Sequence, residues 1–294
     1  MTVYSFGDSF TVGLGTDRDY EESLLMKHPS WNLMSDQEKN IHRKKVNKFR
    51  EKNCFTYFFA NRLNVKYENL GFIGCNNNYI LDLICSYVIG NQITKNDLVL
   101  INFTSSLRNT PSFFPHFFVN RPERGITGIS FGKTEYSFDK FPEYGEIETD
   151  KTIWKKYQGR VDGYRHYLTD YKNIFLKRSF SFDAIDYYNQ NLILFLQDFL
   201  KAFKIKYIMF DAFDSMINTE VFNFTKYIDK KTYWGYNKDT IWSFLDKKND
   251  SSLLETYDEG DQLKRKLHPS TKGHKLFAHE LYKKYQEIYG KPLI

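Results

Sequence analysis

Residues 98–101 read Leu-Val-Leu-Ile, an apolar run that is as short as a strand and has no alternating polar positions. Such continuous runs are typical of strands that are buried on both faces of a parallel sheet. Three further short segments also predict strands, at residues 3–6, 65–70 and 207–210. We therefore predict a sheet that is covered on both faces, which limits the chain to the α/β class.

Between these strands, apolar residues recur at the spacing of an amphipathic helix. The pattern predicts helices over about 55–63, 76–87, 185–203 and 270–288. Strands that alternate with helices pair in parallel through right-handed crossovers. The expected fold is therefore a three-layer α/β/α sandwich around a mainly parallel sheet.

Four residues follow the predicted strands directly, namely Ser9, Gly71, Thr104 and Asp211. Ligands of open α/β sheets bind beyond the carboxyl ends of the strands. We therefore expect these residues to converge on one rim of the sheet.

Three stretches interrupt the alternation, at about 17–52, 110–178 and 215–266. We interpret them as insertions into a single domain that covers residues 1–294, and we expect them to crowd or cover the rim. The basic stretch 42–52 carries Val46 and Phe49 at helical spacing. It is therefore interpreted as a solvated helix face and not as a nucleic-acid patch.

Composition excludes several classes of protein. No apolar segment approaches the ~20 residues that a membrane-spanning helix needs, and the first residues lack the pattern of a signal peptide. The net charge of +6 permits an acidic partner without demanding one. Three cysteines and seven histidines show no metal-ligand spacing. We expect a soluble, cytoplasmic protein without metal, cofactor, nucleic acid or membrane partner; the oligomeric state stays open.

Two segments at opposite ends of the chain are chemically complementary. Residues 7–10 read Gly-Asp-Ser-Phe after the first strand, and His268-Pro269 precede the last helix. A serine hydroxyl is a poor nucleophile unless a base lies beside it. The pattern predicts that Ser9 is a nucleophile at a strand tip and that His268, in a turn, is its base. The competing interpretation makes Ser9 an ordinary helix cap, and His274 is interpreted as a core-facing helix residue.

This pair of blocks resembles the SGNH hydrolases, also called the GDSL esterase/lipase superfamily. The resemblance implies a flavodoxin-like sheet and a serine esterase without cofactor. The abundant Lys, Asn, Phe, Tyr and Ile are typical of AT-rich genomes, and residues 102–109 resemble the Thr- and Ser-rich block of viral relatives. We therefore expect a divergent member of this superfamily. If its source is a virus, we also expect association with the virion.

The resemblance also implies an oxyanion hole. Residues 69–74 read Asn-Leu-Gly-Phe-Ile-Gly, similar to the second block of the family, which assigns a backbone donor to Gly74. The third block departs from the family and places Ser106 where a donor asparagine is usual. Thr104 and Arg108 are further candidates for contact with the substrate.

The family's acid is missing, because Arg265 occupies the position three residues before His268. The acid normally orients the imidazole and stabilises its charged form. A Ser-His dyad or a displaced acid is therefore expected, and the candidates for that acid are Asp261, Asp258, Asp211 and Asp214.

These residues predict serine-dependent ester hydrolysis through an acyl-serine intermediate, on a small-molecule or carbohydrate ester. Among these, the resemblance to the family favours acetyl esters of carbohydrate. Aromatic residues between 113 and 144 suggest stacking platforms for sugars, or equally the small core of an insertion. An acyltransferase that uses the same serine is an alternative. The second alternative is a non-catalytic binding or structural protein that retains the fold. The two departures from the family pattern favour this alternative.

Overall fold

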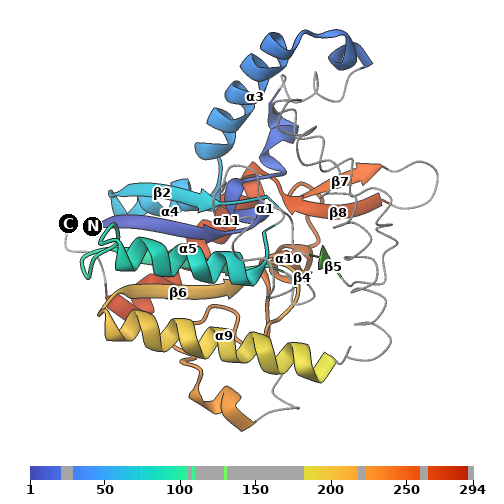
Figure 1. Ribbon diagram of the computed structural model, residues 1–294. Helices are drawn as coiled ribbons and strands as arrows, with labels where there is room; N and C mark the ends of the chain where they lie inside the picture. Colours follow the sequence, from blue (N-terminus) through green and yellow to red (C-terminus); the bar gives the residue numbers. More distant parts are fainter. Residues whose placement is uncertain are drawn as a thin grey trace, which may run out of the picture.

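A four-stranded parallel sheet forms the centre of the molecule in the computed structural model (Figure 1). The structure describes residues 1–20, 29–73, 75–104, 108–109, 129–130, 182–217, 223–258 and 264–290. Across the sheet the strands follow the order β2 (Lys66–Gly71), β1 (Thr2–Gly7), β3 (Leu98–Phe103) and β6 (Lys206–Asp211). This order is that of flavodoxin-like folds, in which the switch point between β1 and β3 forms the ligand crevice.

The central strand β3 explains why both faces of the sheet are covered. All six of its residues are buried, and successive side chains of a strand point to opposite faces. Leu98 and Leu100 therefore enter one core, while Val99 and Ile101 enter the other. The predicted parallel α/β sandwich is confirmed.

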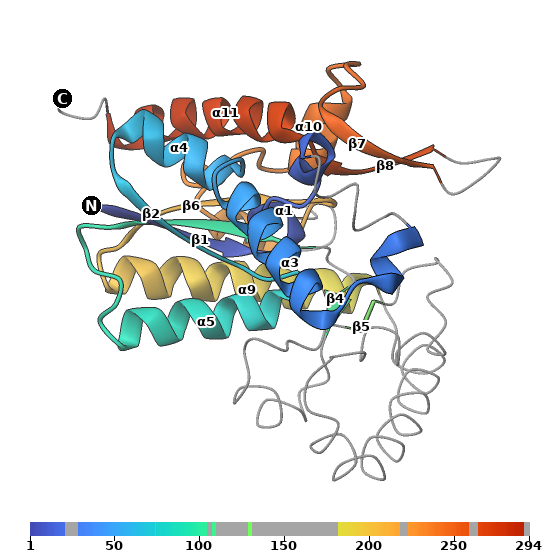
Figure 2. The same ribbon diagram turned by 90° about the horizontal axis from the view of Figure 1, so that it is seen from above.

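One face of the sheet packs against α5 (Asn77–Ile89) and α9 (Phe182–Ala202), which lie side by side in Figure 2. Helix α5 begins at a side-chain cap, because Asn76 accepts the N–H of Tyr79 at 2.8 Å. The apolar residues of both helices meet the sheet in one core that includes Ile84 and Leu196.

The opposite face carries α4 (Phe55–Leu63), α10 (Ile241–Asp246) and α11 (Thr271–Tyr289). Three buried rings join this layer to β6: Phe55, Phe210 and Phe277 have centroids 5.2–5.6 Å apart. Helix α11 begins where the sequence predicts, because Ser270 caps it by accepting the N–H of Gly273.

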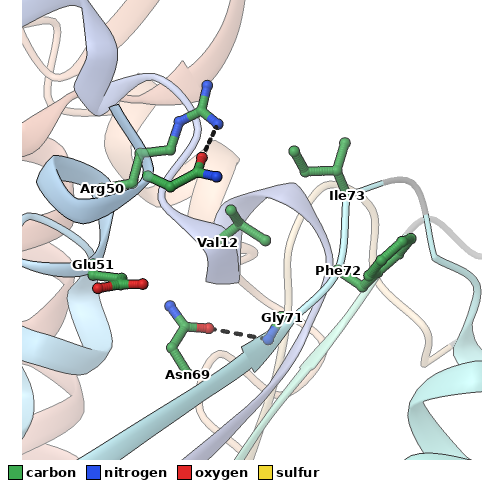
Figure 3. Close-up of a pocket in the computed structure, with 8 residues that line it drawn as sticks. Val12, Arg50, Glu51, Asn69, Gly71, Phe72 and Ile73 are labelled. Carbon is green, nitrogen blue, oxygen red and sulfur yellow. Dashed lines mark hydrogen bonds between the residues drawn. The ribbon is translucent and has the colours of Figure 1, made fainter. Parts of the chain in front are cut away.

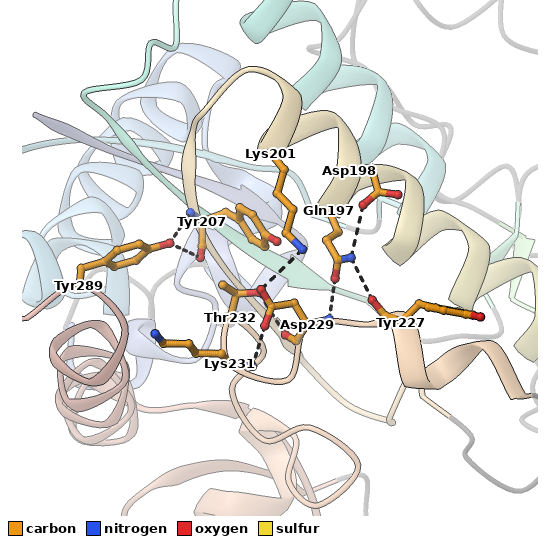
Figure 4. A network of polar contacts seen from close by, with 9 residues as sticks. All are labelled: Gln197, Asp198, Lys201, Tyr207, Tyr227, Asp229, Lys231, Thr232 and Tyr289. Carbon is orange, nitrogen blue, oxygen red and sulfur yellow. Dashed lines mark hydrogen bonds and ion pairs between the residues drawn. The ribbon is translucent and has the colours of Figure 1, made fainter.

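A polar network fastens α9 to the turn that follows η6 (Asn223–Tyr227) (Figure 4). The amide of Gln197 donates to the carbonyl of Tyr227 at 3.1 Å and accepts the N–H of Asp229 at 2.6 Å. Nearby, the hydroxyl of Tyr289 from α11 bonds both backbone groups of Tyr207 at 3.0 Å. These contacts tie α9 to the turn after η6 and α11 to the start of β6.

The first predicted insertion contains η1 (Thr16–Asp19), η2 (Pro29–Leu33) and α3 (Asp36–Glu51). Helix α3 begins with a capping box between Ser35 and Glu38, and it projects from the body of the molecule in Figure 1. Most of its side chains are exposed, as expected of a solvated helix.

The other two insertions differ in how much of them is described. Most of 110–178 lies outside the described residues. Of the described ones, β5 (Ile129–Ser130) forms a short antiparallel pair with β4 (Arg108–Asn109), which precedes the insertion. The third insertion holds η6, α10 and a hairpin of β7 (Leu254–Asp258) and β8 (Lys264–Pro269). His268 therefore lies within β8, one residue before its end, and its expected position in a turn was wrong.

Candidate active site

Ser9 is the first residue of α1 (Ser9–Val12), a short helix that starts directly after β1. Asp8 caps this helix, since its carboxylate accepts the N–H of Phe10 at 3.0 Å. The capping role therefore falls to Asp8, and the side chain of Ser9 is left for another contact. Ser9 is nevertheless only 4 % exposed.

Asp8 is held from the neighbouring strand by two further donors. The amide of Asn102 donates to its carboxylate at 3.2 Å, and the hydroxyl of Thr104 donates to it at 2.8 Å. The same Asn102 amide reaches the hydroxyl of Thr11 at 3.0 Å. A fully buried carboxylate needs such partners, so these contacts fix the turn that carries Ser9 against β3.

His268 lies beside the serine, with its Nε2 3.0 Å from the Ser9 Oγ. The two residues were expected to meet, and this contact joins positions 259 apart in the chain. The ring also packs against Phe10, with centroids 5.4 Å apart, and against Phe213 at 6.4 Å. A serine hydroxyl and an imidazole at hydrogen-bond distance form the minimal pair for nucleophilic catalysis.

Gly15 permits the close approach of the loop after α1 to His268. Its φ is +95°, and a Cβ there would lie 2.5 Å from the Pro269 carbonyl oxygen and 2.7 Å from the His268 Cβ. Only glycine adopts such a conformation at no steric cost. Sequence reasoning missed Gly15; the pair of glycines at 13 and 15 after a predicted strand tip was the available signal.

His274 faces the core, as the sequence predicts, and is 1 % exposed in the first turns of α11. Its ring stacks on Phe55, with centroids 6.0 Å apart and planes 25° apart. Burial lowers the pKa of His274 to about 3, so this imidazole is neutral at physiological pH.

The expected oxyanion and substrate residues are only partly described. Gly74 and Ser106 lie outside the described residues, as does the side chain of Arg108 at the start of β4. Thr104 is fully buried and donates its hydroxyl proton to Asp8, so its side chain supports the turn that carries Ser9.

Of the four candidates for a displaced acid, some are described by the structure and others are not. Asp261 and the side chain of Asp258 lie outside the described residues, and Asp214 is half-buried in the loop after β6. Asp211 is buried at the tip of β6, where it accepts the Tyr233 hydroxyl at 2.6 Å and the Met216 N–H at 3.3 Å.

Among the described residues, the groups that contact or perturb the Asp211 carboxyl are Tyr233, Met216, Ser215 and Asp214. Burial raises the pKa of the Asp211 carboxyl to about 7, and the nearby charge of Asp214 raises it further against the hydrogen bonds. Asp211 is therefore held at the rim of the sheet by Tyr233 and the backbone of Met216.

A pocket of about 330 Å³ opens on the same rim, between α3 and the end of β2 (Figure 3). Its lining residues are Val12, Asn47, Arg50, Glu51, Asn69, Gly71, Phe72 and Ile73. Val12 belongs to the same short helix as Ser9. Sequence reasoning did not find this pocket, because its walls come from segments that have no common pattern.

Within the described ranges, no group of three or more His, Cys, Asp or Glu residues is placed to hold a metal ion. In the same part of the chain, no helix has the length and apolar character needed to cross a membrane.

No protein-family model and no curated protein matches this chain. Among solved structures it is similar to one from Desulfitobacterium hafniense DCB-2 that is named as a lipolytic protein of the G-D-S-L family. The match covers 96 % of this chain and 98 % of that one, at 13 % identity and a TM-score of 0.31. A likeness at this level does not assign the chain to a family.

Proposed function

We propose that this protein is a serine-dependent ester hydrolase in which Ser9 is the nucleophile and His268 the general base. The observation that carries the proposal is the 3.0 Å separation between Ser9 Oγ and His268 Nε2. The pair lies at the carboxyl edge of a parallel sheet with flavodoxin-like strand order, where such folds bind their ligands.

In the first half-reaction, Ser9 Oγ attacks the acyl carbonyl of the ester while His268 Nε2 takes the hydroxyl proton. The carbonyl oxygen then carries negative charge. The first N–H groups of a helix have no partner within it, so the Ser9 N–H is suited to bind this oxygen. By resemblance, the Gly74 N–H is the second donor. His268 returns the proton to the departing alcohol.

In the second half-reaction, water attacks the acyl-serine while His268 accepts its proton. The acid leaves and the hydroxyl of Ser9 is restored. An imidazolium forms in both halves, and the group that orients it is one of the acidic candidates or a backbone carbonyl. If an alcohol replaces water at this step, the same intermediate supports an acyltransferase.

Kinetics on p-nitrophenyl acetate test the proposal. The purified protein should release p-nitrophenol, and Ser9→Ala should abolish the enzymatic rate. Ser86→Ala, at an exposed serine of α5, is the matched control and should retain full activity. Turnover that survives in Ser9→Ala would remove Ser9 as the nucleophile. The absence of turnover in the wild-type protein would favour a non-catalytic binding protein.

A further inference from the structure

We propose that the pocket between α3 and β2 is a subsite for a neutral, hydroxyl-rich part of the substrate, such as one sugar ring. This inference rests on the proposed function, and it names the substrate class of the same site. It comes from the position, lining and charge of the pocket.

The pocket is joined to the serine turn through the backbone. Gly71 pairs with Gly7 in the parallel register, and the Phe72 N–H donates to the Gly7 carbonyl at 2.7 Å. A Cβ on Gly71 would lie 2.8 Å from the Thr11 side chain and from the Val12 nitrogen, so the end of β2 packs directly on α1. The pocket therefore lies on the β2 side of the short helix that begins with Ser9.

One wall is apolar. It is built by Val12, Phe72 and Ile73, and Ile73 is 46 % exposed. The Phe72 ring is braced by Tyr79, with centroids 5.7 Å apart. Ligand pockets generally combine apolar and aromatic walls with a few placed polar groups. The C–H face of a sugar ring suits a wall of this kind.

The opposite wall is polar, but much of its hydrogen-bonding capacity is already used. Arg50 pairs with Asp17 through two of its nitrogens and donates a third bond to Asn47 at 3.1 Å. Asn69 donates to the Thr11 carbonyl at 2.6 Å and accepts the Gly71 N–H at 3.0 Å. These residues shape the pocket and have little capacity left for a ligand.

The Glu51 carboxylate is the exception. It lies at the side of the pocket between Arg50 and Asn69 in Figure 3, and it has no hydrogen-bond or ion-pair partner among the described residues. Asp17 pairs with Arg50, so Glu51 is the charged residue of the lining that has no ion-pair partner among the described residues. Its cationic neighbours along the chain are Arg50, which lines the pocket and pairs with Asp17, and Lys48 and Lys52, which are not among the lining residues. An anionic ligand is therefore disfavoured, while hydroxyl donors find a strong acceptor.

Size and polarity also argue against a long acyl chain. A volume of about 330 Å³ lies at the small end of ligand pockets, which range over about 300–1,000 Å³. A carboxylate that lines the space would have to be desolvated against a lipid tail without a compensating hydrogen bond, which is costly.

Binding and kinetics test the inference separately from the proposed function. Methyl glucoside and glucuronate serve as neutral and anionic probes on Ser9→Ala protein, measured by titration calorimetry. Turnover of 6-O-acetylglucose is measured on protein with an intact Ser9. Each measurement is repeated with Glu51→Ala and with Asp36→Asn, a control at the exposed first turn of the same helix.

We expect methyl glucoside to bind more tightly than glucuronate. Glu51→Ala should weaken the binding of the glucoside and lower kcat/KM for 6-O-acetylglucose by about tenfold, the loss of one hydrogen bond to a charged group. Asp36→Asn should leave both unchanged. Equal binding of the two probes, or equal effects of the two substitutions, would overturn the inference.

These experiments distinguish a failure of the hydrolase proposal from a failure of the subsite proposal. Binding of the glucoside that depends on Glu51 in a protein without esterase activity would overturn the hydrolase and keep the ligand class. Cleavage of p-nitrophenyl acetate without binding of the glucoside would keep the hydrolase and overturn the subsite.

Discussion

Gly15→Ala should damage catalysis through the position of His268. The added Cβ would lie 2.5 Å from the Pro269 oxygen and 2.7 Å from the His268 Cβ. Ordinary contact begins near 3.4 Å, so the end of β8 must move away by just under an ångström. The bond between Ser9 and His268, now 3.0 Å, would then exceed the ~3.2 Å limit of an effective hydrogen bond.

The size of the effect follows from two terms. A left-handed conformation costs an alanine about 1–2 kcal/mol of stability, and overpacking costs about 1–3 kcal/mol more. A misplacement of about 1 Å between reacting groups lowers the rate by about 10²-fold. We therefore expect a moderately destabilised protein with a severely reduced kcat/KM.

Gly13→Ala provides the matched control. Gly13 has a similar φ of +90°, but its Cβ would meet Cys54 at 3.0 Å and the Arg50 carbonyl at 3.2 Å, away from the histidine. Urea unfolding and the kcat/KM for p-nitrophenyl acetate should be measured on both variants. Both should lose stability, and only Gly15→Ala should lose most of its rate. Equal rates in the two variants would refute the reasoning.

Three further predictions concern the rim of the sheet. Asn102→Leu removes a donor from the buried Asp8 carboxylate, so urea unfolding should show a loss of about 1–3 kcal/mol; unchanged stability would contradict this role. Because the folded pKa of Asp211 is raised to about 7, its stabilising contribution is complete below its unfolded pKa and is lost as pH rises through 7. Asp211→Asn should therefore gain stability relative to wild type, on the order of 4 kcal/mol by pH 8, and parallel unfolding profiles between pH 4 and 8 would argue against it. Rates of Asp258→Ala, Asp261→Ala, Asp211→Ala and Asp214→Ala identify the acid: a large loss in one variant names it, and near-normal rates in all four leave a dyad.

The periodicity of the sequence predicts most of the fold. The central strand is predictable because its burial on both faces requires a continuous apolar run, and α11 because Ser270 supplies a cap before an amphipathic pattern. Strand β8 is not predictable in this way. It belongs to a two-stranded hairpin and carries Lys264, Arg265 and Lys266, so it lacks the apolar alternation that marks a strand of the main sheet.

The pairing of Ser9 with His268 is predictable from two short blocks, because each follows or precedes a well-marked element. The hydrogen bonds that hold Asp8 are harder to predict from the sequence. It depends on a polar residue, Asn102, inside an apolar run, and only the register of β3 beside β1 shows which carboxylate it meets. The pocket beside Glu51 depends on how α3 packs against β2, which short-range patterns do not encode.

The central claim is that Ser9 is a nucleophile activated by His268. A fluorophosphonate probe that reacts only with activated serines, followed by mass spectrometry of the labelled peptide, tests it most directly. The account predicts one adduct on Ser9, no adduct in Ser9→Ala, and labelling slowed about 10²–10⁴-fold in His268→Ala, as for the loss of a general base. Labelling of a different serine, or equal labelling rates with and without His268, would contradict it.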